Sequence, residues 1–518
     1  FNAMASARQN ILVIQADQLA APLLRRYGGK AKTPHLDSLA ASGTVFKNFY
    51  CNYPLCGPSR GSMLTGKIAS RVGVYDNAAE LPASEPTVAH FLRHNGYQTC
   101  LSGKMHFIGP DQLHGFEERL TTDIYPADFA WLPDWETGEK GFEPMRNTIE
   151  NAGVCAWNMQ IAFDEEATQR AIHKLYDFSR NPDDDPFFLF VSLSHPHHPF
   201  LTLPEFWEMY SDDEIPGPVV GRLPNEELDP HSLRCRQMIG LDHEDVSEKQ
   251  AVEARHAYYG SISYFDAKLG QILDALDMAG FGENTAIFVT ADHGEMLGER
   301  GLWAKDCFFE SAMKVPLVVK LPDQKTPLEV LENCSLVDLL PTFLDLANID
   351  LSNFRRDMNG QSLLGLLNNN EENWGDEVLA EYAADAAREP VVMIRYGQYK
   401  YIAAQNDPEL LFDLKSDPNE LSNLAHEKPF ESVIEVFRRR VSEIWDLDDL
   451  GRRVRFSQKN RMIVRDAMKE GRLVNWDFSP TADYSDFYVR SSNSHEVVDR
   501  KVRIKAKGYQ LPIPSAAK

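Results

Sequence analysis

The chain has 518 residues, and its 53 Lys and Arg against 77 Asp and Glu give a formal net charge of −24. The length predicts one large and one smaller domain, and the acidic surface argues against nucleic acid or an anionic membrane as a partner. No apolar run approaches the ~20 residues of a membrane span, and seven irregularly spaced cysteines indicate a reducing cytoplasm.

Two apolar segments far apart in the sequence end in potential metal ligands. Residues 10–17 form an apolar run that ends in Asp17, and residues 285–291 form another that is followed by Asp292 and His293. Such runs are typical of buried parallel strands, and ligands of open α/β sheets gather at the carboxyl ends of strands. The three side chains could therefore bind one divalent metal, although each alone could also be an ordinary strand-end group.

Residues 54–66 contain the run Cys-Gly-Pro-Ser-Arg followed by Leu-Thr-Gly. Pro58 suits the first turn of a helix, so Cys56 is expected at a helix N-terminus, where free N–H groups and the helix dipole favour an anion. Arg60 could add a guanidinium that binds two oxygens of a sulfuryl or phosphoryl group. Taken alone, the motif could equally be a buried cysteine before a helix.

Two further strand-like segments end in basic side chains. Residues 97–101 are followed by Lys104 and His106, which lie on one face of an extended segment. The apolar run 186–194 leads into a histidine cluster that begins at His195. The cluster could be read as a second metal site, or as a rigid exposed loop, because two prolines interrupt it.

Together these motifs resemble the type I sulfatases of the alkaline phosphatase superfamily. The resemblance implies that a formylglycine-forming maturation enzyme oxidises Cys56 to formylglycine, whose hydrated aldehyde attacks a small-molecule sulfate ester. It also implies one divalent metal; carboxylate oxygens favour Ca²⁺, with Mn²⁺ or Mg²⁺ as alternatives. The implied metal ligands are Asp17, Gln18, Cys56, Asp292 and His293. The implied catalytic residues are Cys56, Arg60, Asn77, Lys104, His106, His195 and Lys305.

Within this family, the chain is most similar to the choline sulfatases, over residues 100–129 and 475–480. This similarity implies choline-O-sulfate or a similar small alkyl sulfate as substrate. A quaternary ammonium group is recognised by aromatic faces and a carboxylate, for which Trp131 and Asp385 are candidates, although Trp131 could equally serve packing. Arg146 stands where the choline sulfatase pattern is broken, and its charge would oppose a cation.

The family resemblance also implies roles in proton transfer. His195 is expected to protonate the departing alcohol, a role that Lys305 could share, and His106 is expected to take the proton that expels sulfate. The alternatives are an aryl sulfatase or a phosphonate monoester (phosphodiester) hydrolase with the same core, a metal-dependent phosphotransferase that uses an unmodified thiol, and a binding protein without activity.

Strand-like and helical patterns alternate over residues 10–370, which predicts an α/β fold. We expect a large mixed, mostly parallel sheet sandwiched by helices, alkaline phosphatase-like by resemblance, with residues 111–159 as a substrate-side insertion. Residues 371–450 predict a smaller α+β subdomain on an antiparallel sheet. Residues 451–518 resemble a choline sulfatase extension that contacts a neighbouring subunit, which implies a homodimer or homotetramer. Residues 1–9 are expected to be a disordered N-terminal remnant.

Overall fold

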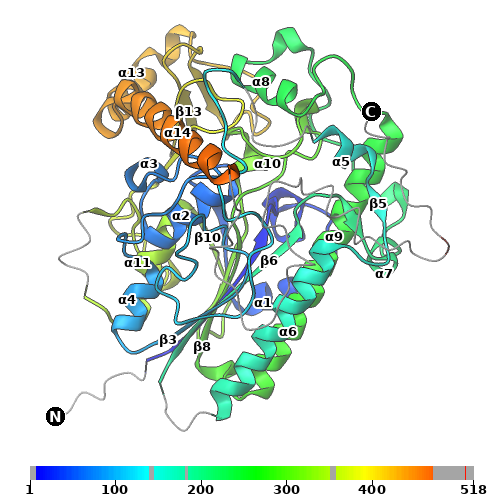
Figure 1. Cartoon of the computed structure of the whole chain (residues 1–518), viewed down its shortest axis with the longest axis vertical. Helices are drawn as coiled ribbons and strands as arrows, with labels where there is room; N and C mark the ends of the chain where they lie inside the picture. The colour runs from blue at the N-terminus through cyan, green and yellow to red at the C-terminus, as the bar shows by residue number, and fades with distance from the viewer. Residues whose placement is uncertain (1–7, 139–144, 181–184, 351–356, 471–507, 509–518) are drawn as a thin grey trace.

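A mixed eight-stranded sheet forms the centre of the molecule (Figure 1). The computed structural model describes residues 8–138, 145–180, 185–350, 357–470 and 508. The strands of the sheet are β1 (Asn10–Asp17), β2 (Thr44–Tyr50), β3 (Gln98–Gly103), β4 (Glu118–Arg119), β6 (Phe187–Pro196), β8 (Thr285–Ala291), β9 (Leu317–Lys320) and β10 (Leu328–Ser335). Their order is β10-β2-β9-β8-β1-β6-β3-β4, in which β9 is antiparallel to both neighbours and the other adjacent pairs are parallel. The predicted fold class is confirmed.

Helices cover both faces of this sheet (Figure 1). One layer contains α1 (Pro34–Ser42), α6 (Met159–Arg180) and α9 (Glu248–Met278); the other contains α2 (Cys56–Thr65), α4 (Val88–His94) and α11 (Leu339–Leu346). Because both faces are covered, β1 is buried along its whole length, which explains its unbroken Ile, Leu and Val run. None of the described helices is both long and apolar enough to cross a membrane.

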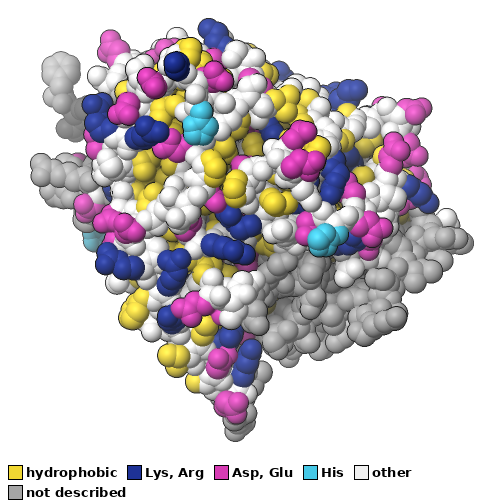
Figure 2. All heavy atoms as spheres, turned by 90° about the horizontal axis from the view of Figure 1, so that it is seen from above, with side chains coloured by type: hydrophobic (Ala, Val, Ile, Leu, Met, Phe, Trp, Pro, Cys, Tyr) yellow, Lys and Arg dark blue, Asp and Glu magenta, His cyan; other side chains and the backbone are white. Residues whose placement is uncertain are grey.

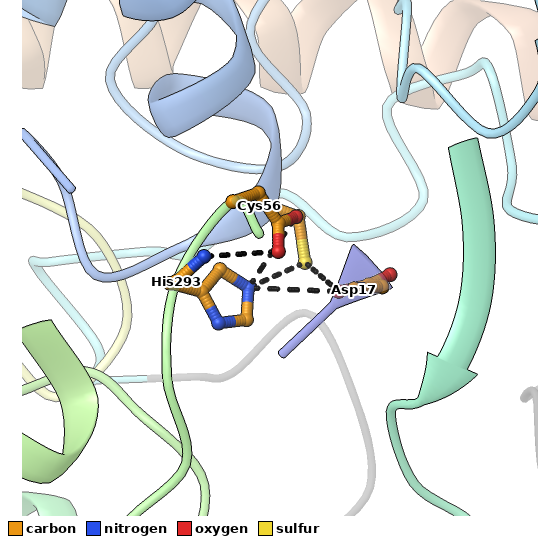
Figure 3. A group of neighbouring side chains, drawn as sticks. Asp17, Cys56 and His293 are labelled. Carbon is orange, nitrogen blue, oxygen red and sulfur yellow. Dashed lines mark hydrogen bonds and ion pairs between the residues drawn. The ribbon is translucent and has the colours of Figure 1, made fainter. Parts of the chain in front are cut away.

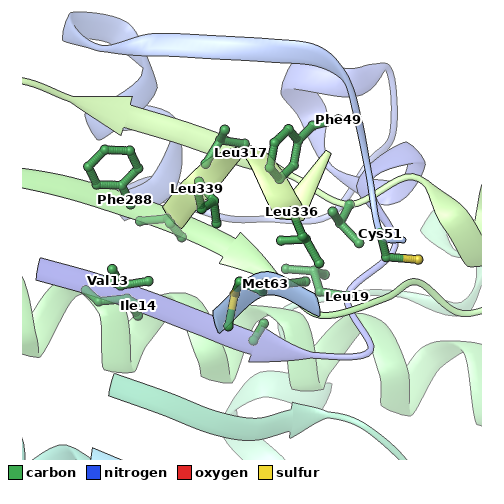
Figure 4. Packing of buried hydrophobic residues seen from close by; sticks show 14 of the residues in the cluster. Val13, Ile14, Leu19, Phe49, Cys51, Met63, Phe288, Leu317, Leu336 and Leu339 are labelled. Carbon is green, nitrogen blue, oxygen red and sulfur yellow. The ribbon is translucent and has the colours of Figure 1, made fainter. Parts of the chain in front are cut away.

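The main hydrophobic core fixes the elements that carry the polar motifs (Figure 4). Val13 and Ile14 of β1 and Phe288 of β8 are fully buried in it. Met63 of α2 and Leu339 of α11 belong to the same cluster, so α2 is held against the sheet by its apolar side chains. The position of the first turn of α2 is therefore set by packing over the rest of the helix.

A second, antiparallel sheet forms the C-terminal part of the chain. It has the order β11-β12-β13-β14, and its β12–β13 hairpin turns at Gly397, whose φ of 56° suits glycine. The strands are β11 (Glu377–Tyr382), β12 (Val391–Tyr396), β13 (Tyr399–Ala403) and β14 (Leu410–Asp413). Two helices, α13 (Glu431–Ile444) and α14 (Leu447–Lys469), pack beside it.

Within the expected insertion, residues 111–159, the described parts 111–138 and 145–158 have little regular structure, yet many of their residues are buried. They contain β4 and two short elements, α5 (Arg146–Glu150) and β5 (Gly153–Val154), the latter paired with β7 (Leu201–Thr202). Residues 475–480, on which part of the family resemblance rests, lie outside the described residues. The remaining short helices are α3 (Ala69–Val72), α7 (Pro204–Trp207), α8 (Pro230–Met238), α10 (Glu310–Met313) and α12 (Leu364–Leu367).

Candidate active site

Polar side chains from several segments meet at one edge of the large sheet. Strands β8, β1, β6 and β3 are consecutive and parallel, so their carboxyl ends lie side by side. Asp17 ends β1, Asp292 and His293 follow β8, and Lys104 follows β3. Helix α2 begins at Cys56 against this edge, and Cys56 itself is 1% exposed. The topology therefore assembles the site from segments that are distant in sequence.

The centre of the site is a compact cluster of four potential metal ligands, three of which are labelled in Figure 3. The Sγ atom of Cys56 lies 3.1 Å from Nε2 of His293 and 3.8 Å from Oδ1 of Asp17. The same Nε2 lies 3.7 Å from Oδ2 of Asp292. One ligand atom from each of the four residues lies within 4.8 Å of the others, and all four residues are buried.

Two cations hold the acids of this cluster in place. Arg60 Nε donates to Asp292 Oδ2 at 2.9 Å, and its Nη1 donates to the Lys104 carbonyl and to Ser192 Oγ, both at 2.8 Å. Lys104 Nζ donates to Asp17 Oδ2. The guanidinium of Arg60 is thus largely engaged by the protein, with Nη2 at 3.9 Å from Asp17 Oδ2. Arg60 therefore positions the carboxylates of Asp292 and Asp17, whereas its motif suggested only that it would bind oxygens of the substrate.

The electrostatics of the cluster favour a bound cation. Burial and the neighbouring Asp292 raise the pKa of Asp17 to about 7. Burial alone would also raise the pKa of Asp292, but Arg60 and His293 outweigh it and hold that pKa well below its usual range. The pKa of the Cys56 thiol is likewise held low by Lys104, Lys305 and His293 against the opposing effect of burial. The site thus gathers anionic donors that a metal ion would stabilise.

The donor set fits a hard or borderline divalent metal. Two carboxylates supply oxygen, His293 supplies nitrogen, and position 56 supplies a fourth ligand atom. Gln18 lies beside them, but its side chain is engaged: Oε1 accepts from Lys305, and Nε2 donates to Glu295. Asp17, Asp292, His293 and position 56 are therefore the residues that would hold the ion.

The histidines at the end of β6 and just after it lie in two environments. His195 Nδ1 lies 2.6 Å from Asp164 Oδ2, and its ring packs 4.5 Å from that of Tyr264, so it faces α6 and α9. His197 Nε2 instead lies 3.1 Å from Lys305 Nζ, and its Nδ1 lies 2.8 Å from the hydroxyl of Tyr125. The structure thus places His197 beside Lys305, whereas the side chain of His195, the histidine expected in the site, contacts Asp164 and Tyr264.

His106 and Asn77 border the first turn of α2. Asn77 Oδ1 accepts from the Gly57 N–H at 2.9 Å, and its carbonyl lies 3.2 Å from His106 Nε2. Asp123 accepts from the backbone N–H of His106 at 2.7 Å and thereby fixes the turn after β3. The ring of Trp131 packs edge-on against that of His106, with centroids 5.7 Å apart. Trp131 therefore lies beside His106 at the border of the site.

The contacts of the other two expected substrate-binding residues lie outside the cluster. Asp385 is buried and lines a cavity of about 210 Å³ together with Trp135. Arg146 Nε binds Glu150 Oε1 at 2.7 Å, and its Nη2 lies 3.5 Å from Glu244 Oε2. The charge of Arg146 is therefore offset by two acids, which makes this side chain a weaker obstacle to a cationic substrate than its sequence position suggests.

Three residues of the site were not identified from the sequence. Tyr125 and Asp123 belong to the segment of low periodicity, where no pattern indicates which side chains turn inward. His197 stands in a visible histidine cluster, but it is two residues from His195, and an extended strand would place both on one face. The sequence could have indicated His197 in place of His195 only if the geometry of the turn after β6 had been known.

Comparisons with protein families cover almost the whole chain. Residues 9–349 match the family model described as Sulfatase, and residues 298–446 match the model N-sulphoglucosamine sulphohydrolase, C-terminal. Residues 452–503 match the model Choline sulfatase enzyme C terminal. The first match includes every residue of the metal-ligand cluster.

Comparisons with individual proteins also identify sulfatases. The chain is 42% identical over 513 residues to a choline-sulfatase of Rhizobium meliloti (strain 1021), covering 96% of this chain and 99% of that protein. It is 30% identical over 467 residues to an arylsulfatase of Clostridium perfringens (strain 13 / Type A), covering 83% and 93%. A phosphonate monoester hydrolase from Silicibacter pomeroyi has the same fold, with a TM-score of 0.69, 22% identity, and 84% and 94% of the two chains covered.

Proposed function

The chain belongs to the sulfatase family and hydrolyses a sulfuric ester, and we propose that its substrate is choline-O-sulfate or a similar small alkyl sulfate. The observation that carries the chemistry is the buried cluster of Asp17, Cys56, Asp292 and His293 with Lys104 and Lys305 around it. The similarity to a choline-sulfatase along nearly the whole chain supports the choice of alcohol.

We further propose that Cys56 is converted to formylglycine by a maturation enzyme and that the metal is Ca²⁺, with Mn²⁺ or Mg²⁺ as alternatives. A formylglycine hydrate would supply the nucleophile, and a metal beside it would make its hydroxyl more acidic. The position of Cys56 at the first turn of α2, within 4.8 Å of three further ligands, supports both parts. The mass of the peptide that contains residue 56 and elemental analysis of the active enzyme test them separately.

The residues around the cluster are suited to binding a sulfuryl group. The ammonium groups of Lys104 and Lys305 would neutralise charge that develops on its nonbridging oxygens. His197 accepts a hydrogen bond from Lys305 Nζ at its Nε2, so these two groups could pass a proton to the departing alcohol. An alkyl alcohol is a poor leaving group, and this proton therefore matters for the rate. His106, beside the first turn of α2, would take the proton that expels sulfate.

The alcohol pocket is proposed to include Trp131 and Asp385. The aromatic face of Trp131 stands next to His106 and Tyr125, where it could pack against a trimethylammonium group. Asp385 would supply the negative charge from the cavity that it lines together with Trp135. Arg146, held by Glu150 and Glu244, would act on the substrate only indirectly.

The test compares sulfate release from choline-O-sulfate with release from its neutral carbon isostere, using enzyme produced together with a formylglycine-forming enzyme. We expect a preference of about a hundredfold, or about 2.7 kcal/mol, for the cation. In Trp131→Leu this preference should shrink, whereas Trp157→Leu, which alters a partly exposed tryptophan, should retain it. Equal rates for the two esters would refute the choline proposal, and faster turnover of aryl sulfates or phosphonate monoesters would favour the alternative substrates.

We also propose a cytoplasmic location and a homodimeric or homotetrameric assembly. All seven cysteines are free and buried, which suits a reducing compartment. The match of residues 452–503 to a choline sulfatase C-terminal model supports the assembly. Light scattering on the purified protein would give the mass of the particle, and a monomer at working concentration would contradict the assembly.

A further inference from the structure

A second cavity, of about 450 Å³, opens between the large sheet and the C-terminal sheet. Its walls come from the end of β2, from α10 and the residue after it, and from the β12–β13 hairpin and the segment after β14. The described lining shares no residue with the candidate active site. The cavity is therefore a separate feature of the fold, and its chemistry does not depend on which sulfate ester the enzyme hydrolyses.

Cations outnumber acids in the lining of this cavity. Lys314, Arg395 and Lys415 line it, against one acid, Glu310. Both oxygens of Glu310 already have partners: Oε1 lies 2.7 Å from Lys400 Nζ, and Oε2 accepts from the Tyr50 hydroxyl at 3.0 Å. Lys400, which does not line the cavity, thus holds one oxygen of this acid, and the lining itself carries three cations against one acid.

The two inner cations retain hydrogen-bonding capacity. Arg395 is 6% exposed; its Nη1 donates to the carbonyls of Gly397 and Tyr399, while its buried Nε has no hydrogen-bond partner among the described residues. Lys314 Nζ donates to the amide oxygen of Asn48 at 3.0 Å and lies 3.8 Å from Glu310 Oε2. An ammonium group offers three donors, and these neighbours do not use them all. An oxyanion could satisfy both side chains.

The pKa values of Glu310 and Lys314 are both lowered, and the main cause differs between them. Burial would raise the pKa of Glu310, but Lys400, Lys314 and Arg395 outweigh it and lower that pKa to about 2. The pKa of Lys314 is lowered by burial, and the nearby charges of Arg395 and Lys400 lower it further against the attraction of Glu310. The lowered pKa of Glu310 indicates positive charge around this acid, whereas burial is the main cause of the shift of Lys314.

We propose that this cavity is a second anion site, which binds a small oxyanion of the sulfate or phosphate class between Lys314 and Arg395. The guanidinium would supply directed donors, the ammonium would supply a point charge, and the exposed Lys415 would attract the anion to the mouth. The anion could come from the sulfate that the enzyme itself releases or from phosphate in the surrounding solution. The cavity exceeds the volume of one such ion, so water or an organic substituent would share it.

Equilibrium binding of labelled sulfate and of labelled phosphate, measured separately on the full chain, tests this proposal. We expect Lys314→Gln to bind one fewer anion per chain than the wild type, with unchanged turnover. Lys325→Gln, which removes an exposed lysine on the turn after β9, should bind as the wild type does. A loss seen with sulfate alone would identify the product as the ligand, and a loss seen with phosphate would identify the second source. Equal stoichiometry in Lys314→Gln and wild type for both anions would overturn the proposal.

A crystallographic measurement locates the site directly. Crystals grown without sulfate or phosphate and soaked in selenate should give an anomalous peak between Lys314 and Arg395, besides the peak expected in the active site. Arg395→Lys keeps the charge but not the directed donors, so its peak should weaken. A peak in the active site alone would overturn the proposal. A peak in the cavity that persists in both Lys314→Gln and Arg395→Lys would mark an adventitious ion only, and would overturn it too.

Discussion

Two of the buried clusters of charged residues differ in how completely their charges are met. In the active site, Arg60 and Lys104 hold the carboxylates of Asp292 and Asp17. Between the two sheets, Lys400 Nζ lies 2.7 Å from Glu310 Oε1, from Glu420 Oε1 and from the Phe308 carbonyl. Both central lysines are fully buried, so burial alone does not distinguish the two clusters.

The two clusters differ in whether their charged groups already have enough partners within the protein. The three donors of Lys400 meet three acceptors, which is the arrangement expected of a structural ion pair. In the active site, Asp17 has a pKa raised to about 7 by burial and by Asp292, and a thiol and an imidazole lie within 4.8 Å. A buried charge is therefore weak evidence of function by itself, whereas a cluster that needs a further ion is strong evidence.

The sharpest test of this contrast is Cys56→Ser. We expect a loss of turnover of at least about a thousandfold, because the residue proposed as the nucleophile is removed, with little change in thermal unfolding. Sulfate release and the unfolding midpoint would be measured on the same preparation. Cys51→Ser is a matched control, because Cys51 is also fully buried but packs against Met313. Appreciable turnover by Cys56→Ser would show that residue 56 is not the nucleophile.

The next largest effect distinguishes His195, at the end of β6, from His197, just after the strand. We expect His197→Asn to lower the rate by about 10² to 10⁴, the usual contribution of a positioned acid or base. The loss should be greatest for alkyl sulfates and smaller for aryl sulfates, whose alcohols leave more easily. His195→Asn should instead lower stability, because it removes the partner of buried Asp164, and its loss should not depend on the leaving group. The reverse pattern would restore His195 as the acid.

The sequence was sufficient to predict the fold class and to propose the ligands of the central cluster. A buried strand that ends in an acid is a local pattern, so Asp17 and Asp292 could be proposed without knowledge of their neighbours. The partners of Arg60 could not be predicted, because Ser192 and the Lys104 carbonyl approach it from strands that become adjacent only in the folded sheet. Tyr125 was missed for a similar reason: its segment is positioned by Asp123 and not by any periodicity.

Lys400→Met tests the structural cluster, and its expected effect is the reverse of that of Cys56→Ser: a loss of stability without a loss of turnover. Removal of the central cation leaves Glu310 and Glu420 buried without their shared partner, which should destabilise the fold by about 3 to 5 kcal/mol. Turnover per folded molecule should be unchanged. Urea unfolding and sulfate release below the transition would measure the two properties. A large fall in turnover without destabilisation would show that this cluster also serves the reaction.

The acid of the same cluster predicts a pH dependence of stability. The pKa of Glu310 is lowered from 4.5 to about 2; burial opposes this shift, while Lys400, Lys314 and Arg395 produce it. A lowered pKa in the folded state contributes stability above the ordinary value, and that contribution is lost as the pH falls from about 4.5 towards 2. The unfolding midpoints of wild type and Glu310→Gln should therefore converge over this range. A constant difference between them would contradict the assignment.

The smallest effect concerns a structural ion pair, one residue of which directly precedes a residue of the active site. On α14, Arg461 binds buried Asp76 through two contacts, Nη1–Oδ1 at 2.5 Å and Nη2–Oδ2 at 2.8 Å. The next residue, Asn77, accepts from the Gly57 N–H directly after the candidate nucleophile. Arg461→Gln should loosen this loop and lower kcat by about tenfold, or about 1.4 kcal/mol, with little change in KM.

Arg465→Gln is the matched control for this prediction, because it removes the same charge one turn farther along α14, where Arg465 pairs with exposed Asp466. It should leave kcat unchanged. Arg461→Lys should fall between the wild type and Arg461→Gln, since a lysine keeps the charge but cannot form the two-point contact with Asp76. If Arg461→Gln lowered only the unfolding midpoint, the ion pair would belong with Lys400 among the structural clusters. A fall in kcat at unchanged stability would show that a satisfied ion pair can still position a catalytic group.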